Sequence, residues 1–387
     1  MFTKLVILIP TRNRGELACR SVMSVVKSQA KLPVDVIISD NSTDSKESAV
    51  IDSFLAEQAP RGVSLIRPPT PLAMTEHWQW AITRAMSVHD ASHFFMLTDR
   101  MLFKDGALPD LLAITEKYPD ELISFTYDRI DDYSRPISYL PLPRTGLLYR
   151  MDTRDLLRLT ANMVFYSCFP RMLNSVAPRN VLAKLEGRYG SVFASVSPDY
   201  CFCFRVLGMI PAMLYYDNSL LVNYASDRSN GASFSRGITT RDSADFERNL
   251  ATGAFNSETP VPGIRTVGNA VIHEYCSVRE QSNDDSYPEV ALRPYLNHLA
   301  REISAFLDPA ARASASKILA DEGWRATNGF KWRLLKTSLA LRLLAMRKRK
   351  FGTLDEAIRY ATTHPSKNKP WVSRIHRRYG RQILPLS

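Results

Sequence analysis

The sequence contains little cysteine, and its cysteines follow no pattern that would stabilise a small fold. Five cysteines among 387 residues are scattered along the chain and form no Cys-x-x-Cys pair. This pattern argues against a disulfide framework and against a structural zinc site. A chain of this length can bury a sufficient core without either. Cys201 and Cys203 lie two residues apart in an aromatic run and are predicted to be buried thiols.

Long apolar runs are also missing. The first one, residues 5–9, is short and is followed at once by Pro10 and two nearby arginines, which predicts a strand rather than a signal peptide. No stretch approaches the roughly 20 apolar residues that a membrane-spanning helix needs. We therefore expect a cytoplasmic protein, or one attached to the cytoplasmic face of a membrane.

Two glycine-rich phosphate-binding motifs are absent. No Gly-x-Gly-x-x-Gly follows the first predicted strand, which disfavours a nicotinamide-type Rossmann domain, and no Gly-x-x-x-x-Gly-Lys-Ser/Thr marks a P-loop. The composition, 45% hydrophobic and 23% charged, is that of a folded protein. The formal net charge of +11 comes from 50 Lys+Arg against 39 Asp+Glu, and the C-terminal region is strongly basic.

Strand and helix signals alternate over the first 130 residues. Strands are predicted at residues 4–9, 34–39, 63–66, 93–98 and 122–127. Helices are predicted at residues 16–30, 44–58, 75–87 and 109–117, and Asp44 is expected to cap the second of them. This order predicts an α/β fold with a mostly parallel, doubly wound sheet and flanking helices. Ligands bind such sheets at the carboxyl ends of the strands.

The alternation fades after about residue 130. Residues 129–144 are polar and contain proline, which predicts a loop, and residues 153–172 are predicted to be mostly helical. A long polar stretch at residues 226–256 is predicted to be irregular, and loops of that length are often functional or mobile. From residue 294 to about residue 360 we expect helices.

Polar clusters follow three of the predicted strands. They are Pro10-Thr11-Arg12-Asn13-Arg14, Asp40-Asn41-Ser42-Thr43-Asp44 and Leu97-Thr98-Asp99-Arg100. The first two resemble the family-2 glycosyltransferases, which have the GT-A fold. That family has a Pro-Thr/Ser-x-Asn-Arg turn after its first strand and an Asp followed by a Gly/Asn-Ser-Thr-Asp turn after its second. The resemblance covers residues 1 to about 230 and weakens after about residue 130.

The resemblance implies three parts of the chain. Residues 1–130 would form the nucleotide-sugar-binding half of the GT-A domain, residues 131–290 the acceptor-side half with mobile loops, and residues 291–387 a basic helical region. It also implies donor contacts from the first two clusters, by Pro10, Thr11, Arg12, Asn13, Asp40 and Asn41. Asp40 would contact the base or ribose of the nucleotide, because a carboxylate at a buried strand end otherwise needs an explanation. The alternative for the second cluster is an Asx-turn that caps a helix, which we accept for Asp44.

The fourth strand departs from the family pattern. The family carries Asp-x-Asp there, whose carboxylates hold a divalent cation on the diphosphate, whereas this sequence has Asp99-Arg100-Met101. A thioether is a poor ligand for a hard cation such as Mg²⁺. Either Asp99 holds Mg²⁺ or Mn²⁺ with water and phosphate oxygens, or Arg100 neutralises the diphosphate itself. The alternative is that Arg100 is a surface residue paired with Asp99 or Asp105.

Two further positions are candidates for the reaction. Inversion by a single displacement needs one carboxylate to remove the acceptor proton, and Asp199, after Pro198 and before an apolar run, has the position that the family uses. Its alternative is an ordinary helix N-terminus. Arg228, in an Asp-Arg-Ser-Asn-Gly segment, could close over the diphosphate as a lid, or the segment is simply a turn. His77 and the pair His273-Glu274 stay open, the latter as metal ligands.

The C-terminal region contains a basic amphipathic pattern at residues 331–350. Its apolar residues recur at three- and four-residue steps, at Trp332, Leu335, Leu339, Leu343 and Met346. Positive charge comes from Arg333, Lys336, Arg342, Arg347, Lys348, Arg349 and Lys350. A second basic cluster follows, at Arg374, Arg377, Arg378 and Arg381. Such helices often lie on anionic membranes, and the alternative is a helix packed on the catalytic domain with a solvated basic face. We find no recognised nucleic-acid module and expect no nucleic-acid partner.

Taken with the resemblance, these features predict an inverting glycosyltransferase for bacterial surface polysaccharide synthesis. The donor would be a nucleotide-diphosphate sugar, UDP-linked, and the acceptor a glycan or a lipid-linked molecule. The alternative, favoured by Met101, is a catalytically weakened GT-A module that binds glycan or scaffolds a synthase. A sugar nucleotidyltransferase is disfavoured, because its Gly-rich, Lys-bearing loop is missing.

Overall fold

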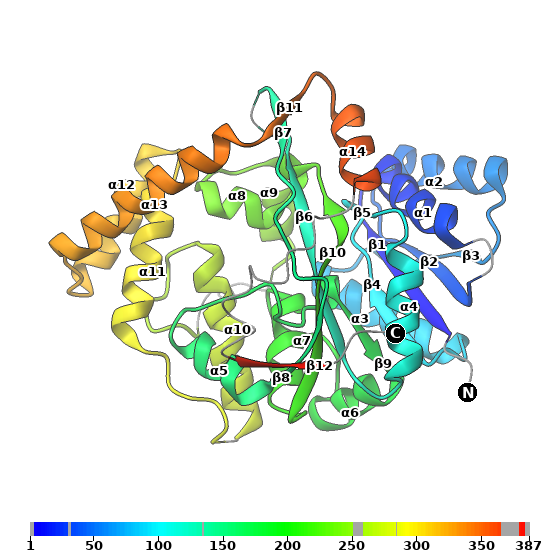
Figure 1. Ribbon diagram of the computed structural model, residues 1–387, viewed down its shortest axis with the longest axis horizontal. Coiled ribbons are helices and arrows are strands. Elements are labelled where there is room, and N and C mark those ends of the chain that lie inside the picture. The colour runs from blue at the N-terminus through cyan, green and yellow to red at the C-terminus, as the bar shows by residue number, and fades with distance from the viewer. Residues whose placement is uncertain are drawn as a thin grey trace.

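The computed structural model describes residues 4–29, 32–133, 135–250, 258–283, 285–364 and 379–383. Its strands within these ranges are β1 (Leu5–Thr11), β2 (Val34–Asp40), β3 (Val63–Ile66), β4 (His93–Met96), β5 (Met101–Phe103), β6 (Ile123–Asp131), β7 (Ile137–Tyr139), β8 (Leu148–Asp152), β9 (Ser175–Pro178), β10 (Ala212–Asn223), β11 (Arg349–Phe351) and β12 (Gly380–Ile383). Together they form a 12-stranded mixed sheet with helices on both faces (Figure 1).

The helices fall into two groups. Those that cover the sheet are α1 (Gly15–Gln29), α2 (Ser45–Gln58), α3 (Met74–Val88), α4 (Ala107–Lys117), α5 (Thr153–Ala161), α6 (Arg179–Tyr189), α7 (Pro198–Leu207), α10 (Val267–Ser282) and α14 (Leu354–Thr363). The others are α8 (Asn230–Arg236), α9 (Arg241–Arg248), α11 (Leu292–Ser304), α12 (Pro309–Asp321) and α13 (Asn328–Met346). In Figure 1, α11, α12 and α13 lie on the side of the sheet away from α1 and α2.

The topology brings the ends of the main strands to one edge. The sheet order is β12-β8-β10-β6-β9-β4-β1-β2-β3. β1 runs parallel to β2 and β4, β2 to β3, and β6 to β10, while β9 is antiparallel to both β4 and β6. The carboxyl ends of β1, β2, β4, β6 and β10 therefore meet at the same edge. This confirms the predicted α/β class, a mostly parallel sheet with flanking helices and a C-terminal helical region.

Two hydrophobic cores lie on opposite faces of this sheet. Side chains alternate along β1, so that Val6 and Leu8 pack with α3, α5 and α7 in one core, while Ile7 and Ile9 pack with α1 and α4 in the other. Strands buried on both faces read as continuous apolar runs, which is why their positions were predictable from the sequence. All five cysteines are free thiols, and Cys201 and Cys203 are buried as predicted.

Two predictions for residues 129–172 were wrong. β6 continues to Asp131, and β7 lies within the predicted loop because it pairs with β6 and with β11, which is some 210 residues later in the chain. The helix predicted over residues 153–172 stops at Ala161, because Met163 adopts a left-handed backbone with φ 58°. The following residues are irregular up to a 3₁₀ turn at Met172–Asn174.

Two predictions later in the chain were also wrong. Residues 226–250 are not irregular but contain α8 and α9, whose N-caps Ser229 and Thr240 accept backbone N–H groups through their side chains. Residues 251–256 of the predicted stretch lie outside the described residues. The helix predicted over residues 331–350 ends at Met346, since the basic residues that follow form β11. No helix among the described residues has the length and apolar composition to cross a bilayer.

Candidate active site

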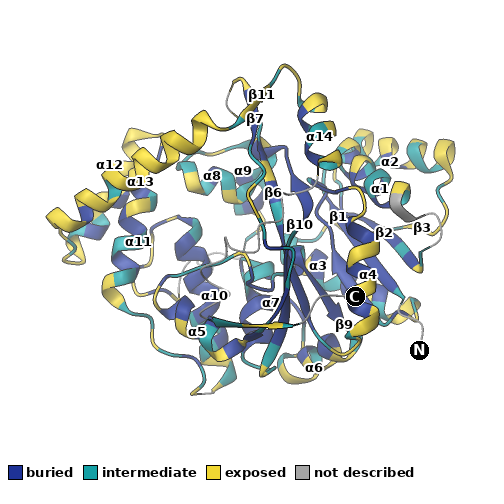
Figure 2. Cartoon of the chain, viewed as in Figure 1, coloured by how far each residue is buried: buried dark blue, intermediate teal, exposed yellow. Residues whose placement is uncertain are grey.

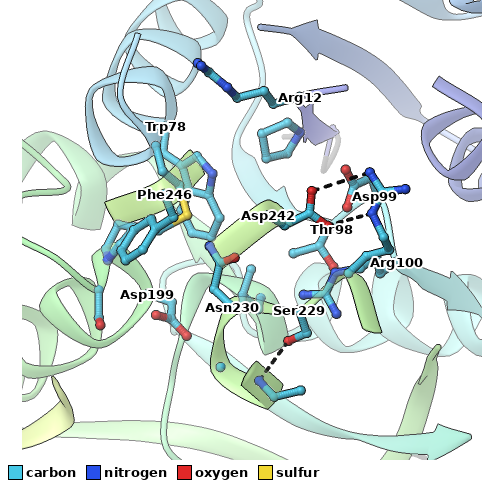
Figure 3. Close-up of a pocket in the computed structure, with 18 of the residues that line it drawn as sticks. Arg12, Trp78, Thr98, Asp99, Arg100, Asp199, Ser229, Asn230, Asp242 and Phe246 are labelled. Atoms are coloured by element: carbon cyan, nitrogen blue, oxygen red, sulfur yellow. Dashed lines mark hydrogen bonds and ion pairs between the residues drawn. The ribbon is translucent and has the colours of Figure 1, made fainter. Parts of the chain in front are cut away.

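A cavity of about 520 Å³ lies at the carboxyl ends of the parallel strands. Its walls come from the turns after β1, β2 and β4, from β6 and β10, from the N-terminal ends of α7 and α10, and from the segment that carries α8 and α9. Figure 3 shows Asp99 and Arg100 on one side of this cavity and Asp199 toward the other, with Asn230 between them.

The charges on the cavity wall are unbalanced. Among the described residues that line it, eight are arginines and four are aspartates, with no lysine or glutamate. The arginines are Arg12, Arg14, Arg100, Arg129, Arg171, Arg228, Arg241 and Arg248. The aspartates are Asp99, Asp199, Asp242 and Asp245. Guanidinium groups recognise phosphate and carboxylate through paired N–H donors, so this cavity is suited to an anionic ligand.

The turns after β1 and β2 are locked to each other by asparagines. Asn13, in a left-handed conformation with φ 56°, accepts the N–H groups of Thr43 and Asp44 through Oδ1 at 2.9 and 3.0 Å. Asn41 makes two hydrogen bonds to the backbone of Leu72, at 2.8 and 2.9 Å. Asp44 caps α2 as predicted, accepting the N–H of Lys46. These side chains shape the cavity mouth rather than point free donors into it.

Asp40 is the one predicted donor-binding residue that does not line the cavity. Its carboxylate accepts from Ser48 Oγ at 2.8 Å, from Arg67 Nε at 2.9 Å and from the N–H of Ser42 at 3.0 Å. Burial opposes ionisation of Asp40, but the hydrogen bonds from Ser42, Arg67 and Ser48 outweigh it and lower the pKa. A contact between Asp40 and the nucleoside stays a prediction, and it would require the carboxylate to give up one of these bonds.

Asp99 accepts hydrogen bonds from the end of β1 and from the turn that follows it. It accepts from Thr11 Oγ1 at 2.9 Å, and Arg14 Nη1 lies 3.3 Å from its other oxygen. Met101 begins β5 and is buried in the core on the α1 side, and it also contributes to the lining of the cavity. The described residues contain no group of three His, Cys, Asp or Glu side chains arranged to hold a metal ion. A divalent cation held by Asp99 therefore stays a prediction.

Arg100 presents an unpaired positive charge. Its Nε is buried without a hydrogen-bond partner, and no carboxylate lies within ion-pair distance of its guanidinium in the described part of the chain. Burial lowers the pKa of Arg100 to about 10, and the nearby charges of Arg14 and Arg129 act in the same direction. The alternative of an Arg100 paired with Asp99 or Asp105 is not what the structure shows. A partly buried guanidinium that faces the cavity without a carboxylate partner is suited to an anionic ligand.

Asp199 lies in the first turn of α7, beside Arg171. Its Oδ2 is 4.0 Å from Arg171 Nη1, and the Arg171 guanidinium stacks over the rings of Tyr127 and Tyr200 at 5.6 and 5.3 Å. Burial raises the pKa of Asp199, while Arg171 and the α7 backbone N–H groups act against the rise. A half-buried carboxylate with a raised pKa, facing a cavity, has the properties expected of a general base.

The loop before Asp199 is held from α3 and α10. Gln79 on α3 accepts the N–H groups of Val192 and Phe193 through Oε1, at 2.8 and 2.9 Å. Glu274 on α10 accepts those of Val196 and Ser197, at 2.9 and 2.6 Å. These contacts fix the entry to α7, and so they fix where the Asp199 carboxylate can lie.

The pair His273-Glu274, left open as metal ligands, takes part in this support instead. His273 Nδ1 accepts the N–H of Glu258 at 3.2 Å, which places the proton on Nε2 and lets it donate to Ser195 Oγ at 2.8 Å. Both ring nitrogens are therefore engaged. His77 lines the cavity, but its Nε2 is hydrogen-bonded to Ser39 Oγ at 2.8 Å. Burial lowers the pKa of His77 to about 4.

We expect Glu274→Ala to destabilise the protein by about 2–4 kcal/mol, because two buried N–H groups lose their acceptor. Glu274→Gln keeps Oε1 and should cost far less. Burial raises the pKa of Glu274 from 4.5 to about 8, so its contribution to stability is full below about pH 4.5 and is lost as the pH rises toward 8. Urea unfolding at pH 6 and pH 9 measures both effects, and Gln should flatten the pH dependence.

The matched control is Glu280→Ala, an exposed residue on the same helix, which should be neutral. If Glu274→Ala unfolded at the same urea concentration as the unchanged protein, the supporting role of Glu274 would be wrong.

The segment with α8 and α9 covers the cavity through ion pairs. Arg228 donates to Asp242 at 2.6 Å and to the backbone oxygen of Asn13 at 3.1 Å. Asp242 also lies 3.6 Å from Arg14, and Asp245 accepts from Arg12 at 3.0 Å. Residues 226–248, here called the cavity cover, are therefore a structured segment, and Arg228 lies at its start. Asp242 and Asp245 of this cover form ion pairs with Arg14 and Arg12, which line the cavity.

The structure brings most of the predicted site residues into one cavity. Pro10, Thr11, Arg12, Asn13, Asn41, Asp99, Arg100, Asp199 and Arg228 all line it. Sequence reasoning missed Arg171, Tyr127 and Asp242, which lie in segments with no motif. Arg14 was quoted in the first motif without a role, and its position beside Asp99 shows that it belongs to the site.

Comparisons with known proteins found similar solved structures. Crystal structures of S. aureus TarS 1–349 in complex with UDP-GlcNAc and with UDP match with TM-scores of 0.45 and 0.43, at 9% and 11% identity, over 82% of this chain and 89% and 88% of those chains. A structure of S. aureus TarS matches with a TM-score of 0.43 at 11% identity, and this chain spans 53% of its length. No family model and no curated protein matches the sequence.

Proposed function

We propose that the protein is an inverting glycosyltransferase that moves a sugar from a nucleoside-diphosphate sugar, UDP-linked, to a hydroxyl of a glycan or lipid-linked acceptor. The observation that carries this proposal is the unpaired Arg100 guanidinium and the raised-pKa carboxylate of Asp199 in one cavity. Such a displacement requires a group that binds the anionic leaving group and a general base that removes the acceptor proton. The turn motifs after β1 and β2 support the same class.

The reaction is a single displacement at the anomeric carbon. Asp199 removes the acceptor hydroxyl proton as the acceptor oxygen forms the new bond, and the bond from the anomeric carbon to the phosphate oxygen breaks. The electron pair stays on the leaving nucleoside diphosphate. Arg100, with Arg14 and Arg228 beside it, neutralises the charge that develops there, as preorganised donors do in other phosphate-leaving reactions. Surface polysaccharide synthesis supplies acceptors of this kind.

A thermal-shift panel tests the proposal directly. UDP, GDP, CDP and dTDP and their sugars are added to the full chain, and a ligand at 100 times its Kd stabilises by roughly 2.7 kcal/mol. We expect one nucleotide series to raise the melting temperature clearly, and transfer to follow with that donor. Stabilisation by a donor with no transfer to any acceptor would favour the glycan-binding or scaffold alternative. No stabilisation by any nucleotide would overturn the proposed transferase function.

The cover makes a separate prediction. Because Asp242 pairs with Arg14 and Arg228, a diphosphate must compete with its carboxylate for them. Asp242→Asn is therefore expected to tighten nucleoside-diphosphate binding by about 3–30-fold, measured by titration calorimetry. Asp227→Asn, in the same segment but outside the cavity lining, should leave affinity unchanged. Weaker binding in Asp242→Asn would mean that the ion pairs persist in the bound state.

A further inference from the structure

α13 carries two apolar stripes on opposite sides. At about 100° per residue, Phe330, Leu334, Leu341 and Leu344 fall within about 80° of one another. The second stripe, here called the outward stripe, lies opposite and spans a similar angle. It consists of Trp332, Leu335, Leu339, Leu343 and Met346. A helix with two such stripes has two faces that favour an apolar surface.

Only the N-terminal part of the first stripe has a partner within the protein, since Leu341 and Leu344 are 61% and 39% exposed. Phe330 is buried and Leu334 packs partly against the cluster formed by α10, α11 and α12, and Phe330 meets the Trp324 ring edge-on at 5.1 Å. The outward-stripe residues are instead 56–82% exposed. Figure 2 shows α13 along the outer margin of the molecule, exposed over almost its whole length. Of the two alternatives given for this helix, packing of the outward stripe on the catalytic domain is not what the structure shows.

Basic residues flank the outward stripe on both sides. On the helical projection Lys331 and Arg342 lie along one edge, and Lys336, Arg333 and Arg347 lie along the other. No Asp or Glu occurs between residues 323 and 354. The face is thus a narrow apolar line between two cationic rows, a combination that is suited to contact with an anionic lipid surface.

A second copy of this chain fits the face less well. Two outward stripes in contact would place the cationic rows of both helices against each other, and α13 offers no carboxylate to offset them. On a membrane, the outward stripe would contact the lipid acyl chains, and both rows of basic residues would pair with anionic headgroups. Charge complementarity therefore selects the membrane over self-association.

We propose that α13 binds peripherally to anionic lipid, with the outward stripe inserted between the headgroups. The helical region with α13 is joined to the cavity cover, because the N–H of Leu307 donates to the backbone oxygen of Arg236 at 2.7 Å. Membrane binding would thus bring the cover and the cavity close to the lipid surface. The proposal does not rest on the proposed function, since lipid binding needs no catalysis.

Vesicle co-sedimentation of the full-length protein tests it. Wild type is expected to bind vesicles of phosphatidylcholine with 30% phosphatidylglycerol, to bind pure phosphatidylcholine vesicles far less, and to be released by high salt. Replacing Leu335, Leu339 and Leu343 by Gln should weaken binding on the order of 100-fold. Replacing Lys331, Lys336 and Arg342 by Gln should weaken it by a similar factor.

The matched control replaces three exposed apolar residues outside α13, Val88, Leu292 and Leu307, by Gln, and should bind as wild type does. All three variants should keep the wild-type melting temperature, since the replaced side chains are exposed. Equal binding by the Leu variant, or equal binding to neutral vesicles, would overturn the proposal. So would a concentration-dependent dimer, seen by sedimentation equilibrium, that the Leu variant dissociates while no vesicle binding occurs.

Discussion

Asp199→Asn is expected to bind the donor nucleotide normally and to transfer sugar about 10²–10⁴-fold more slowly. Asparagine keeps the shape of the side chain at the start of α7 but cannot take a proton. The Asp199 carboxylate lies 4.0 Å from Arg171 and lines the same cavity as Arg100, so loss of its basicity should affect the chemical step alone. Donor affinity by calorimetry and turnover with the native acceptor are the paired measurements.

A helix-terminal role for Asp199 makes a different prediction. Asparagine is also well tolerated at helix N-termini, so stability and turnover would both stay near those of the unchanged protein. Asp308→Asn, at the N-cap of α12 and outside the cavity, is the control for the effect of this replacement at a helix start. Turnover of Asp199→Asn within a few-fold of wild type would remove Asp199 as the base.

The assignment of Asp199 as the general base also predicts how the transfer rate depends on pH. The base works only as the carboxylate, and burial raises the pKa of Asp199 above the ordinary 3.8. Transfer should therefore fall as the pH drops through this raised pKa, at a higher pH than an ordinary aspartate would give.

The first half of the fold was predictable because its signals are local. Strands such as β1 are buried on both faces, so their sequences are continuous apolar runs. Asp44 is a favourable N-cap residue and marks the start of α2. The order of strands and helices then follows from short connections. Boundaries from the sequence agree with β3 and lie within a few residues for α1 and α3.

The remainder depends on contacts between distant residues. β7 is three residues long and exists because β6 and β11 pair with it, which no local pattern reveals. Arg171 belongs to the site only because irregular chain after α5 brings it against Tyr127 and Asp199. Asp40 shows a second limit of sequence reasoning: its position at a strand end predicted a ligand contact, and no local pattern revealed that Ser48 and Arg67 also bond to it inside the protein.

Arg100→Met is expected to weaken nucleoside-diphosphate binding by about 10–100-fold, while the free protein keeps or gains stability. Hydrogen bonds to charged groups contribute about 1.5–3 kcal/mol each, which corresponds to that range. Stability is expected to hold or rise because the replacement removes a half-buried charge without a carboxylate partner, close to Arg14 and Arg129. A structural role for Arg100 would give the reverse, with lower stability and unchanged affinity.

Chelation and a charge control complete this test. If Arg100 neutralises the diphosphate, turnover should survive EDTA in the unchanged protein and fall sharply in Arg100→Met. Arg61→Met, in an exposed turn away from the cavity, removes the same charge and should change neither affinity nor turnover. Turnover that vanishes with EDTA and returns with Mn²⁺ would assign the charge on the diphosphate to a metal ion. In that case Asp99 would bind the ion through the remaining lone pairs of its oxygens, each of which also accepts one hydrogen bond, from Thr11 or from Arg14.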